Sequence, residues 1–272
     1  LEQKLRLLID RQLLAKTNFV PSVSLIDLVL SFRSETSQPI WDILLSIAAS
    51  LKIFFDPKTK TFQSYQNFLR QLTKSQIQRL GLTAKPQESS NDSKLRPMLL
   101  ATTVLANDTE LIESLTNLYQ ADLLKINADI RPSILLAKLI SSDEQILPKF
   151  ISNYQVATDQ DLKADLLACI ARVKKPQNIK LVIDLLKQPK TIRHQDHLSF
   201  LAQLLSNPFT KASAADWLYS NWNYVLEITN AKSTDYYLRV MANHVRTPAE
   251  AERFFDFFDP LSDQPALNRA IQ

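Results

Sequence analysis

The chain has 272 residues, of which 45% are hydrophobic, and its formal net charge of +4 is small for this length. A chain of this size and composition can bury a large core, which excludes a disordered protein. Gly81 is the only glycine, and because β-hairpins and bulges need glycine where φ is positive, the composition predicts an all-helical fold.

The N-terminal part combines apolar runs with charges. Glu2 and Lys4 interrupt the first apolar positions, so a signal peptide is not expected. The most apolar run, residues 40–55, contains Asp42 and Lys52, whereas a membrane-spanning helix needs about 20 apolar residues in a row. No membrane partner is therefore expected.

Apolar residues three and four positions apart recur along most of the chain, as in residues 179–186 and 198–205. This spacing is typical of amphipathic helices. Pro39, Pro176 and Pro248 stand where the first turns of three helices are expected, a position that tolerates proline. The pattern predicts helices of about 10 to 18 residues joined by short turns.

Residues 83–94, TAKPQESSNDSK, contain no large apolar side chain. This composition is typical of a loop, which we expect to be mobile. The loop is also the place where an N-terminal group of helices could be divided from the rest. No change in composition marks two independent domains, so residues 1–272 are predicted to form a single helical-repeat domain.

An internal repeat follows, in which residues 96–120 align without gaps with residues 131–155. Asp108 and Asp143 are candidate N-caps between the two helices of each segment. Two helices per repeat are typical of HEAT and armadillo proteins, so we predict an α-solenoid of stacked antiparallel helix pairs that curves into a bowl. The identical pairs are Arg96/Arg131, Pro97/Pro132, Leu100/Leu135, Asp108/Asp143, Tyr119/Tyr154 and Gln120/Gln155. The repeated arginines are expected to tie adjacent helix pairs together.

Cys169 is the only cysteine, so an internal disulfide is excluded. It lies between Ala168 and Ile170 in an apolar helical pattern, which predicts a packed, unreactive thiol. A chain without disulfides suits a reducing compartment, and a cytoplasmic location is therefore expected.

Residues 172–193 are strongly basic. Asp184 is the only acidic residue among seven lysines and arginines, so this segment carries +6 and the remainder of the chain −2. The segment can attract an anionic partner, either nucleic acid or the carboxylate of a peptide. The same residues can also be solvated helix ends, with lysines near C-termini. The sequence leaves both interpretations open.

The stretch TIRHQDHLSF, residues 191–200, places His194 and His197 on one face of a predicted helix. Two such histidines can contribute to a metal site, but His244 is the only other histidine, and the chain has neither an HExxH motif nor a cysteine pair. No metal site is therefore predicted. No nucleophile lies in a recognisable catalytic pattern, and phosphate-binding loops need more than one glycine. An enzyme that works alone is not expected.

Arg193 and Asp196 are three residues apart in this stretch. Such a pair often forms a local ion pair or caps a helix. Both side chains, with Gln195 between them, can instead contact a substrate or a neighbouring domain. Further along, Trp217 and Trp222 fall on one apolar stripe and are expected in the core. An asparagine in the same stripe, residue 221, is predicted to be a buried amide that bonds backbone groups.

Residues 192–227 resemble a pattern in the C-terminal helical domain of zinc aminopeptidases of the aminopeptidase N family. The resemblance extends to LLIDRQLLAK near the N-terminus, PIWDIL around Trp41 and INADIRPSI at residues 126–134, and it is similar to the versions of lactic-acid bacteria. Asn207–Pro208 departs from the pattern, because many relatives have glycine after the asparagine, and the geometry of this turn stays open. The matching positions are Ile192, Arg193, Gln195, Asp196, Asn207, Ala215, Trp217, Asn221 and Trp222.

The resemblance implies a peptidase of several domains, in which a separate catalytic domain carries an HExxH zinc motif and a Gly-x-Met-Glu-Asn motif. Neither motif occurs in this chain. The chain is then a non-catalytic C-terminal domain that caps the catalytic domain and shapes the chamber in which peptides lose N-terminal residues. Zinc is expected in the catalytic domain and not in this chain, and the expected partners are that domain and peptides, without nucleic acid. Arg193 is expected to face the chamber, with Gln195 and Asp196 orienting it or touching substrate.

A second interpretation is a free-standing helical-repeat scaffold that binds a protein or nucleic acid through its concave face. The chain begins inside a predicted helix, LEQKLRLLIDRQ, without an initiating methionine. This start favours a fragment of a larger peptidase over the scaffold.

Overall fold

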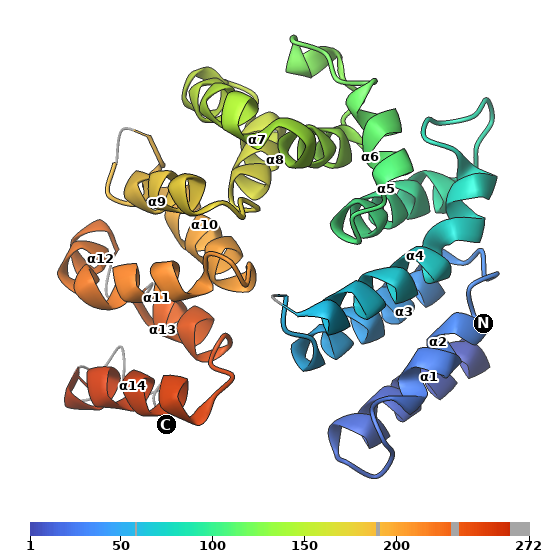
Figure 1. The fold of residues 1–272 in the computed structure, drawn as a ribbon, viewed down its shortest axis with the longest axis horizontal. Coiled ribbons are helices and arrows are strands. Elements are labelled where there is room, and N and C mark those ends of the chain that lie inside the picture. The colour runs from blue at the N-terminus through green and yellow to red at the C-terminus, as the bar shows by residue number, and fades with distance from the viewer. Residues whose placement is uncertain (58, 189–190, 230–233, 262–272) are drawn as a thin grey trace. The chain divides into compact units, whose positions relative to one another are not determined.

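The computed structural model describes residues 1–57, 59–188, 191–229 and 234–261, without the side chains of residues 143 and 144. Every regular element in these ranges is a helix (Figure 1). The predicted all-helical class is confirmed. None of the described helices is long and apolar enough to cross a membrane.

The chain divides into two compact units, Leu1–Ser141 and Ser142–Gln272. The predicted loop at residues 83–94 lies inside the first unit. The helices of the first unit are α1 (Glu2–Lys16), α2 (Ser24–Ser31), α3 (Gln38–Leu51), α4 (Lys60–Leu80), α5 (Ser90–Leu105) and α6 (Thr109–Thr116), with the short 3₁₀ helices η1 (Lys52–Phe54) and η2 (Leu123–Lys125).

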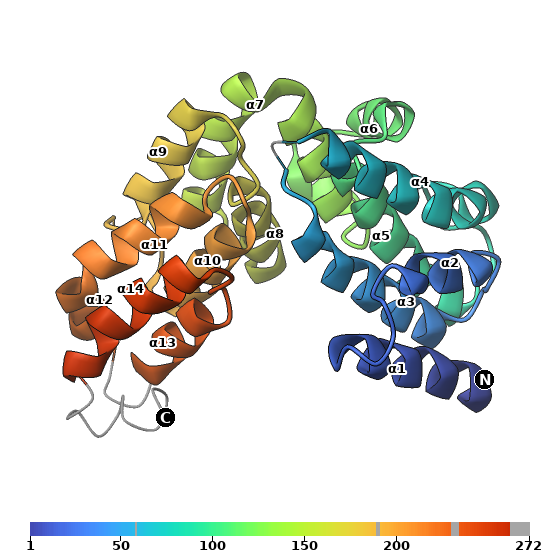
Figure 2. The same cartoon turned by 60° about the horizontal axis from the view of Figure 1, so that its bottom comes forward.

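Helices of the first unit pack as stacked pairs. α1 packs against α2 and α3, α2 packs against α3 and α4, and α5 packs against α3, α4 and α6. Stacked hairpins bring each helix into contact with the helix two places further along the chain, as α1 and α3 or α2 and α4 are here. Figure 2 shows α1 to α4 side by side. The pairwise packing predicted from the repeat is therefore confirmed.

The core of the first unit gathers side chains from several helices. Leu8 of α1, Val29 of α2, Trp41 of α3 and Leu99 of α5 belong to one cluster, and each is fully shielded from solvent. The indole Nε1 of Trp41 donates to the backbone oxygen of Glu35 at 2.7 Å. The buried tryptophan is thus both packed and hydrogen-bonded, as buried indoles usually are.

The second unit is centred on α10, the helix that contains the histidine-rich stretch. α10 packs against α8, α11 and α13, and α11 packs against α9 and α12. The helices are α7 (Arg131–Val156), which crosses the boundary between the units, α8 (Gln160–Ile170), α9 (Pro176–Leu185), α10 (His194–Ser206), α11 (Lys211–Ser220), α12 (Trp222–Ile228), α13 (Thr234–Ala242) and α14 (Pro248–Phe258), followed by η3 (Asp259–Leu261).

Asparagine takes the place that glycine often has at helix ends. Gly81 ends α4 with φ 70°, but Asn18 and Asn107 end α1 and α5 with φ of 61° and 58°. After Asn18, the N–H of Phe19 donates to the oxygen of Leu14 at 2.9 Å, which is the outer bond of a Schellman motif. A chain with one glycine can still end its helices because asparagine tolerates this left-handed conformation.

The predicted starts of helices are largely confirmed. Pro39, Pro176 and Pro248 lie in the first turns of α3, α9 and α14. Asp108 caps α6, with its Oδ1 accepting a backbone N–H at 2.9 Å. The side chain of Asp143, the N-cap candidate of the second repeat, lies outside the described residues.

The sequence repeat coincides with a structural one. The first segment is interrupted at Asn107, between α5 and α6. The aligned position in the second segment is Ser142, where φ of −151° and ψ of 38° break the helical geometry inside α7. Each segment therefore consists of two helical pieces with a break at the same repeat position.

The predicted loop is shorter than expected. Residues 81–89 are not helical, but α5 begins at Ser90. The prediction of a loop through residue 94 is therefore wrong for its last five residues. The reason is the hydroxyl of Ser89, which accepts the backbone N–H of Asp92 at 3.1 Å and caps α5.

Arg96 ties α5 to the end of α4 and to this loop. Its side chain is 4% exposed and pairs with Glu88, with Nη1 donating to Glu88 Oε2 at 2.7 Å. Nε donates to the oxygen of Gly81 at 3.2 Å. The hydrogen bond from Arg96 lowers the pKa of Glu88. The predicted tie is confirmed for Arg96, while Arg131 is buried at the start of α7 and its role stays a prediction.

Candidate functional site around Arg193

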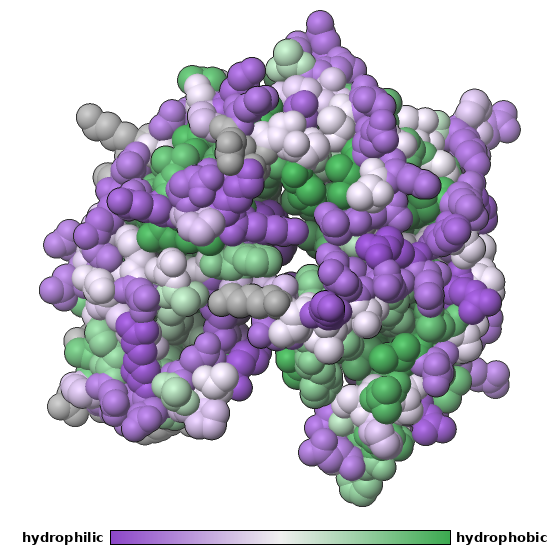
Figure 3. Space-filling view, viewed as in Figure 1, coloured by the Kyte–Doolittle hydropathy of each residue, from purple (hydrophilic) through white to green (hydrophobic). Residues whose placement is uncertain are grey.

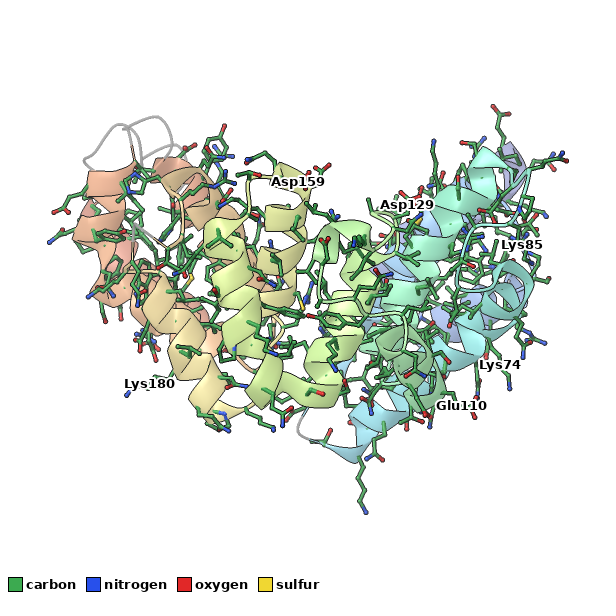
Figure 4. The ribbon with its side chains drawn as sticks, turned by 90° about the horizontal axis from the view of Figure 1, so that it is seen from above. Lys74, Lys85, Glu110, Asp129, Asp159 and Lys180 are labelled. Carbon is green, nitrogen blue, oxygen red and sulfur yellow. The ribbon has the colours of Figure 1, made fainter. Side chains whose placement is uncertain are left out.

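The basic segment predicted at residues 172–193 runs from the end of α8 to the start of α10. Lys174, Lys175, Lys180 and Lys187 are exposed, and Lys180 extends from α9 into solvent (Figure 4). Lys190 lies outside the described residues. The described lysines give the second unit an exposed positive surface at α9 and at the turn before it.

Arg193 is the N-cap residue of α10 and belongs to a hydrogen-bonded cluster. Its Nε donates to Asp196 Oδ2 at 2.6 Å, and the hydroxyl of Tyr154 donates to the same oxygen at 2.7 Å. Nη1 of Arg193 donates to Gln160 Oε1. Because Tyr154 lies on α7, Gln160 on α8 and Asp196 on α10, the cluster joins three helices of the second unit.

Charges in the cluster support this pattern of donors. Burial and, in second place, the hydrogen bond to the Asp196 carboxylate raise the pKa of Tyr154 to about 12. The tyrosine therefore keeps its proton at neutral pH and can donate it to Asp196. The hydrogen bond to Asp196 also raises the pKa of Arg193. The local ion pair that the sequence allowed is present, and contact with a substrate stays a prediction.

The Arg193 guanidinium is held at one edge and reaches solvent. Its side chain is 32% exposed, against 19% for Asp196. Gln195 is exposed beside it, and its side chain makes no hydrogen bond within the described part of the chain. One carboxylate, that of Asp196, and one amide, that of Gln160, fix the direction of the guanidinium. Its exposed part can therefore receive an anionic group without a large loss of side-chain entropy.

His197 cannot serve as a zinc ligand in this arrangement. Its Nε2 lies 3.0 Å from the oxygen of Leu186, and its Nδ1 lies 3.0 Å from the hydroxyl of Tyr237. A carbonyl oxygen can only accept, so Nε2 carries the proton and Nδ1 accepts from Tyr237. His194 is exposed, and the described residues hold no cluster of three or more metal-ligating side chains. The residues that the structure describes therefore do not fit zinc.

Metal analysis of the purified chain is expected to find no stoichiometric zinc, because the one lone pair of the His197 ring is used by Tyr237. The measurement is the metal content after dialysis against zinc, for the wild type and for His194→Ala. Equal values near zero are expected. One zinc per chain that disappears in His194→Ala would contradict the assignment of His197.

The family of the chain follows from a match along nearly its whole length. A family model described as ERAP1-like C-terminal domain matches residues 2–272. The chain belongs to this family. The resemblance to the C-terminal domain of aminopeptidase N, which Arg193 and its neighbours carry, is thereby confirmed.

Relatives of this ERAP1-like C-terminal domain are aminopeptidases by name. Aminopeptidase N of Lactobacillus helveticus is 28% identical over 99% of this chain and 32% of its own length. Aminopeptidase N of Lactococcus lactis subsp. cremoris is 25% identical over the same shares. Aminopeptidase 2 of Candida albicans is 25% identical over 82% of this chain and 25% of its own length. The chain spans about a third of the length of the bacterial relatives.

Asn207 closes α10 of the ERAP1-like C-terminal domain. Its Nδ2 donates to the oxygens of Ala171 and Val173 at 2.9 and 2.8 Å, and its Oδ1 accepts the N–H of Phe209 at 3.1 Å. Its φ of −88° and ψ of 116° are extended, as a following Pro208 requires. The departure from the family pattern is therefore accommodated without a positive φ, and the buried amide joins α10 to the turn between α8 and α9.

The aromatic stripe of the ERAP1-like C-terminal domain is in its core. Trp217 and Trp222 are 7% and 5% exposed, which confirms the prediction. Asn221 bonds the backbone as predicted, with Nδ2 donating to the oxygen of Trp217 at 2.7 Å, but it is only half-buried. The prediction of a buried amide is therefore wrong in its burial, because Asn221 lies at the junction between α11 and α12, where a helix ends.

Sequence reasoning misses two members of the Arg193 cluster. Tyr154 and Gln160 are 42 and 33 residues from Asp196 and Arg193, their respective partners. The repeat points to Tyr154 only as the partner of Tyr119, with no sign of a polar role. The identity of Tyr119 and Tyr154 in the repeat is the one signal in the sequence that could have found it.

Two hollows lie elsewhere on the ERAP1-like C-terminal domain. In the first unit, a polar groove of about 1010 Å³ between α4 and α6 is lined by residues that include Lys74 and Glu110, both labelled in Figure 4. In the second unit, a pocket of about 150 Å³ is lined by residues that include Tyr219, Met241 and His244. Neither hollow is lined by the Arg193 cluster.

Proposed function

We propose that this chain is the non-catalytic domain of a zinc metallopeptidase of the aminopeptidase N type. In this proposal it caps the catalytic domain and helps to form the chamber in which peptides lose their N-terminal residue. The support is the family match over residues 2–272 together with relatives that carry the name aminopeptidase and are about three times longer. The catalytic domain of the same polypeptide and peptide substrates are then its partners.

The zinc of the proposed enzyme belongs to the catalytic domain. Both ring nitrogens of His197 are engaged, and the described residues hold no group of three metal-ligating side chains, so in this proposal the zinc ligands lie in the catalytic domain. The buried thiol of Cys169, whose pKa is raised by burial, is unreactive. A buried free thiol suits a reducing compartment, and the proposal includes a cytoplasmic location.

Arg193 carries the proposed contact with substrate. A peptide that enters by its N-terminus keeps a free carboxylate at the far end, and a guanidinium is the side chain best suited to bind it. Asp196 and Gln160 hold the Arg193 side chain in one direction. The exposed lysines at α9 add a positive electrostatic potential that attracts the C-terminal carboxylate of the peptide.

Replacing Arg193 by alanine in the full-length protein is expected to raise KM for peptides about tenfold, because one charge-assisted hydrogen bond to the peptide carboxylate is lost. KM for single-residue chromogenic amides, which lack the distant carboxylate, is expected to stay unchanged. Arg246→Ala is the control, since it removes an exposed arginine of the second unit that lies outside the basic segment, and both KM values are expected to stay unchanged. Equal changes for peptides and amides would assign Arg193 a structural role only.

A further inference from the structure

Large apolar side chains are exposed along one edge of the first unit. Phe19 is 79% exposed and Val23 67%, both in the turn between α1 and α2. Ile53 and Phe54 are 66% and 62% exposed, both in η1 between α3 and α4. We call these four residues the apolar edge. Single exposed apolar residues are common, whereas several close together mark a contact surface.

Helix stacking brings these two turns next to each other. α1 packs on α3 and α2 packs on α4, so one hairpin lies on the other. Helices joined by short turns run antiparallel, and the C-terminal ends of α1 and α3 therefore point to the same edge of the unit. Figure 2 shows both ends on one side, and Figure 3 shows apolar residues gathered over the positions of α1, α2 and α3.

The apolar edge is presented by ordered turns. Asn18 with φ 61° and the 2.9 Å bond from the Phe19 N–H to the Leu14 oxygen fix the end of α1. The N–H of Phe55 donates to the oxygen of Lys52 at 3.1 Å and closes η1. In a Schellman motif the residue at the Phe19 position commonly packs back on its own helix, whereas here it faces solvent. Docking on such preformed turns costs little ordering entropy.

We propose that the apolar edge docks the remainder of the same polypeptide, the part that longer relatives carry besides their ERAP1-like C-terminal domain. The inference rests on the proposed function. The matched part is 32% of the Lactobacillus helveticus relative, and the family is a C-terminal domain, so the other part precedes α1. The end helix of a helical stack needs a polar or covered outer face, but α1 exposes Ile9 at 50% and Leu13 at 58%. The preceding part of the chain is the partner best placed to cover them.

A cleavable full-length protein tests this surface. A specific protease site is placed ahead of Leu1, the folded protein is cleaved, and the affinity between the two pieces is measured by dilution and size-exclusion chromatography. The wild-type pieces are expected to stay associated. The double variant Phe19→Ser/Phe54→Ser is expected to weaken their association about tenfold or more. The control Val156→Ser/Phe255→Ser, at positions 74% and 48% exposed in the second unit, is expected to leave it unchanged.

Several outcomes would overturn the inference. Wild-type pieces that separate on cleavage, or a double variant that keeps wild-type affinity, would show that the apolar edge does not hold them. If this domain forms a dimer that the double variant abolishes, and the affinity between the two pieces stays unchanged, the apolar edge binds a second copy of the domain instead. An unchanged helical circular dichroism signal, together with slower amide hydrogen exchange at residues 17–23 in the associated state, separates loss of contact from loss of folding. A polypeptide without peptidase activity contradicts the proposed function, whereas a peptidase whose pieces associate independently of the edge contradicts only this inference.

Discussion

Between pH 7 and pH 4, the free energy of unfolding of the second unit is expected to fall by about 3 kcal/mol through His197 alone. Burial lowers the pKa of His197 from 6.5 to about 4, and its side chain is 1% exposed. Protonation in the folded state would place a charge among Trp217 and Tyr237, whose rings lie 5.3 and 5.8 Å from the imidazole. It would also remove the acceptor that Nδ1 offers to Tyr237.

The direction of this pH effect follows from proton binding. Below pH 6.5 the unfolded chain binds a proton at His197 while the folded chain does not, so acid favours unfolding. The contribution of His197 to stability is complete above pH 6.5 and is lost as the pH falls toward 4. Urea titrations of the wild type and of His197→Gln at several pH values measure it, because the carboxylates that both proteins share cancel in the difference. Parallel stability curves for the two proteins would contradict a neutral, buried His197.

Replacing Trp41 by alanine is expected to destabilise the first unit by about 4 kcal/mol. The side chain is fully buried among α1, α2 and α5, and the cavity left behind cannot be filled by water without polar partners. Trp41→Phe keeps most of the packing and removes the donor to the Glu35 oxygen, so a smaller loss of about 1 kcal/mol is expected. Denaturant unfolding followed by circular dichroism measures both. Equal losses in the two variants would show that the hydrogen bond, and not the packing, carries the effect.

Patterns that repeat along the chain predict its local structure well. The spacing of apolar residues gives the helices, Pro39, Pro176 and Pro248 mark helix starts, and the aligned segments at 96–120 and 131–155 share a break at Asn107 and Ser142. Each of these features depends on residues close in sequence. Burial of the tryptophans follows as well, because a helical stripe of large apolar residues has to face the core.

Contacts between distant segments are what the sequence does not reveal. Arg193 and Asp196 lie within one helical turn, so the sequence could offer a local ion pair as one of two interpretations. The Tyr154 hydroxyl, in contrast, reaches Asp196 from another helix. His197 is held by the end of α9 and by α13, so nothing near it in sequence shows that its ring nitrogens are engaged. The same limit applies to the start of α5, where one capping hydroxyl, that of Ser89, turns an apparent loop into helix.

The complete sequence of the intact protein tests the central claim most directly. This sequence, checked against the intact mass and the zinc content of the purified protein, is expected to contain an HExxH motif and a downstream glutamate ahead of Leu1, with one zinc bound outside the present 272 residues. An intact protein made of these 272 residues alone would contradict the assignment to an aminopeptidase and would favour a free-standing helical scaffold.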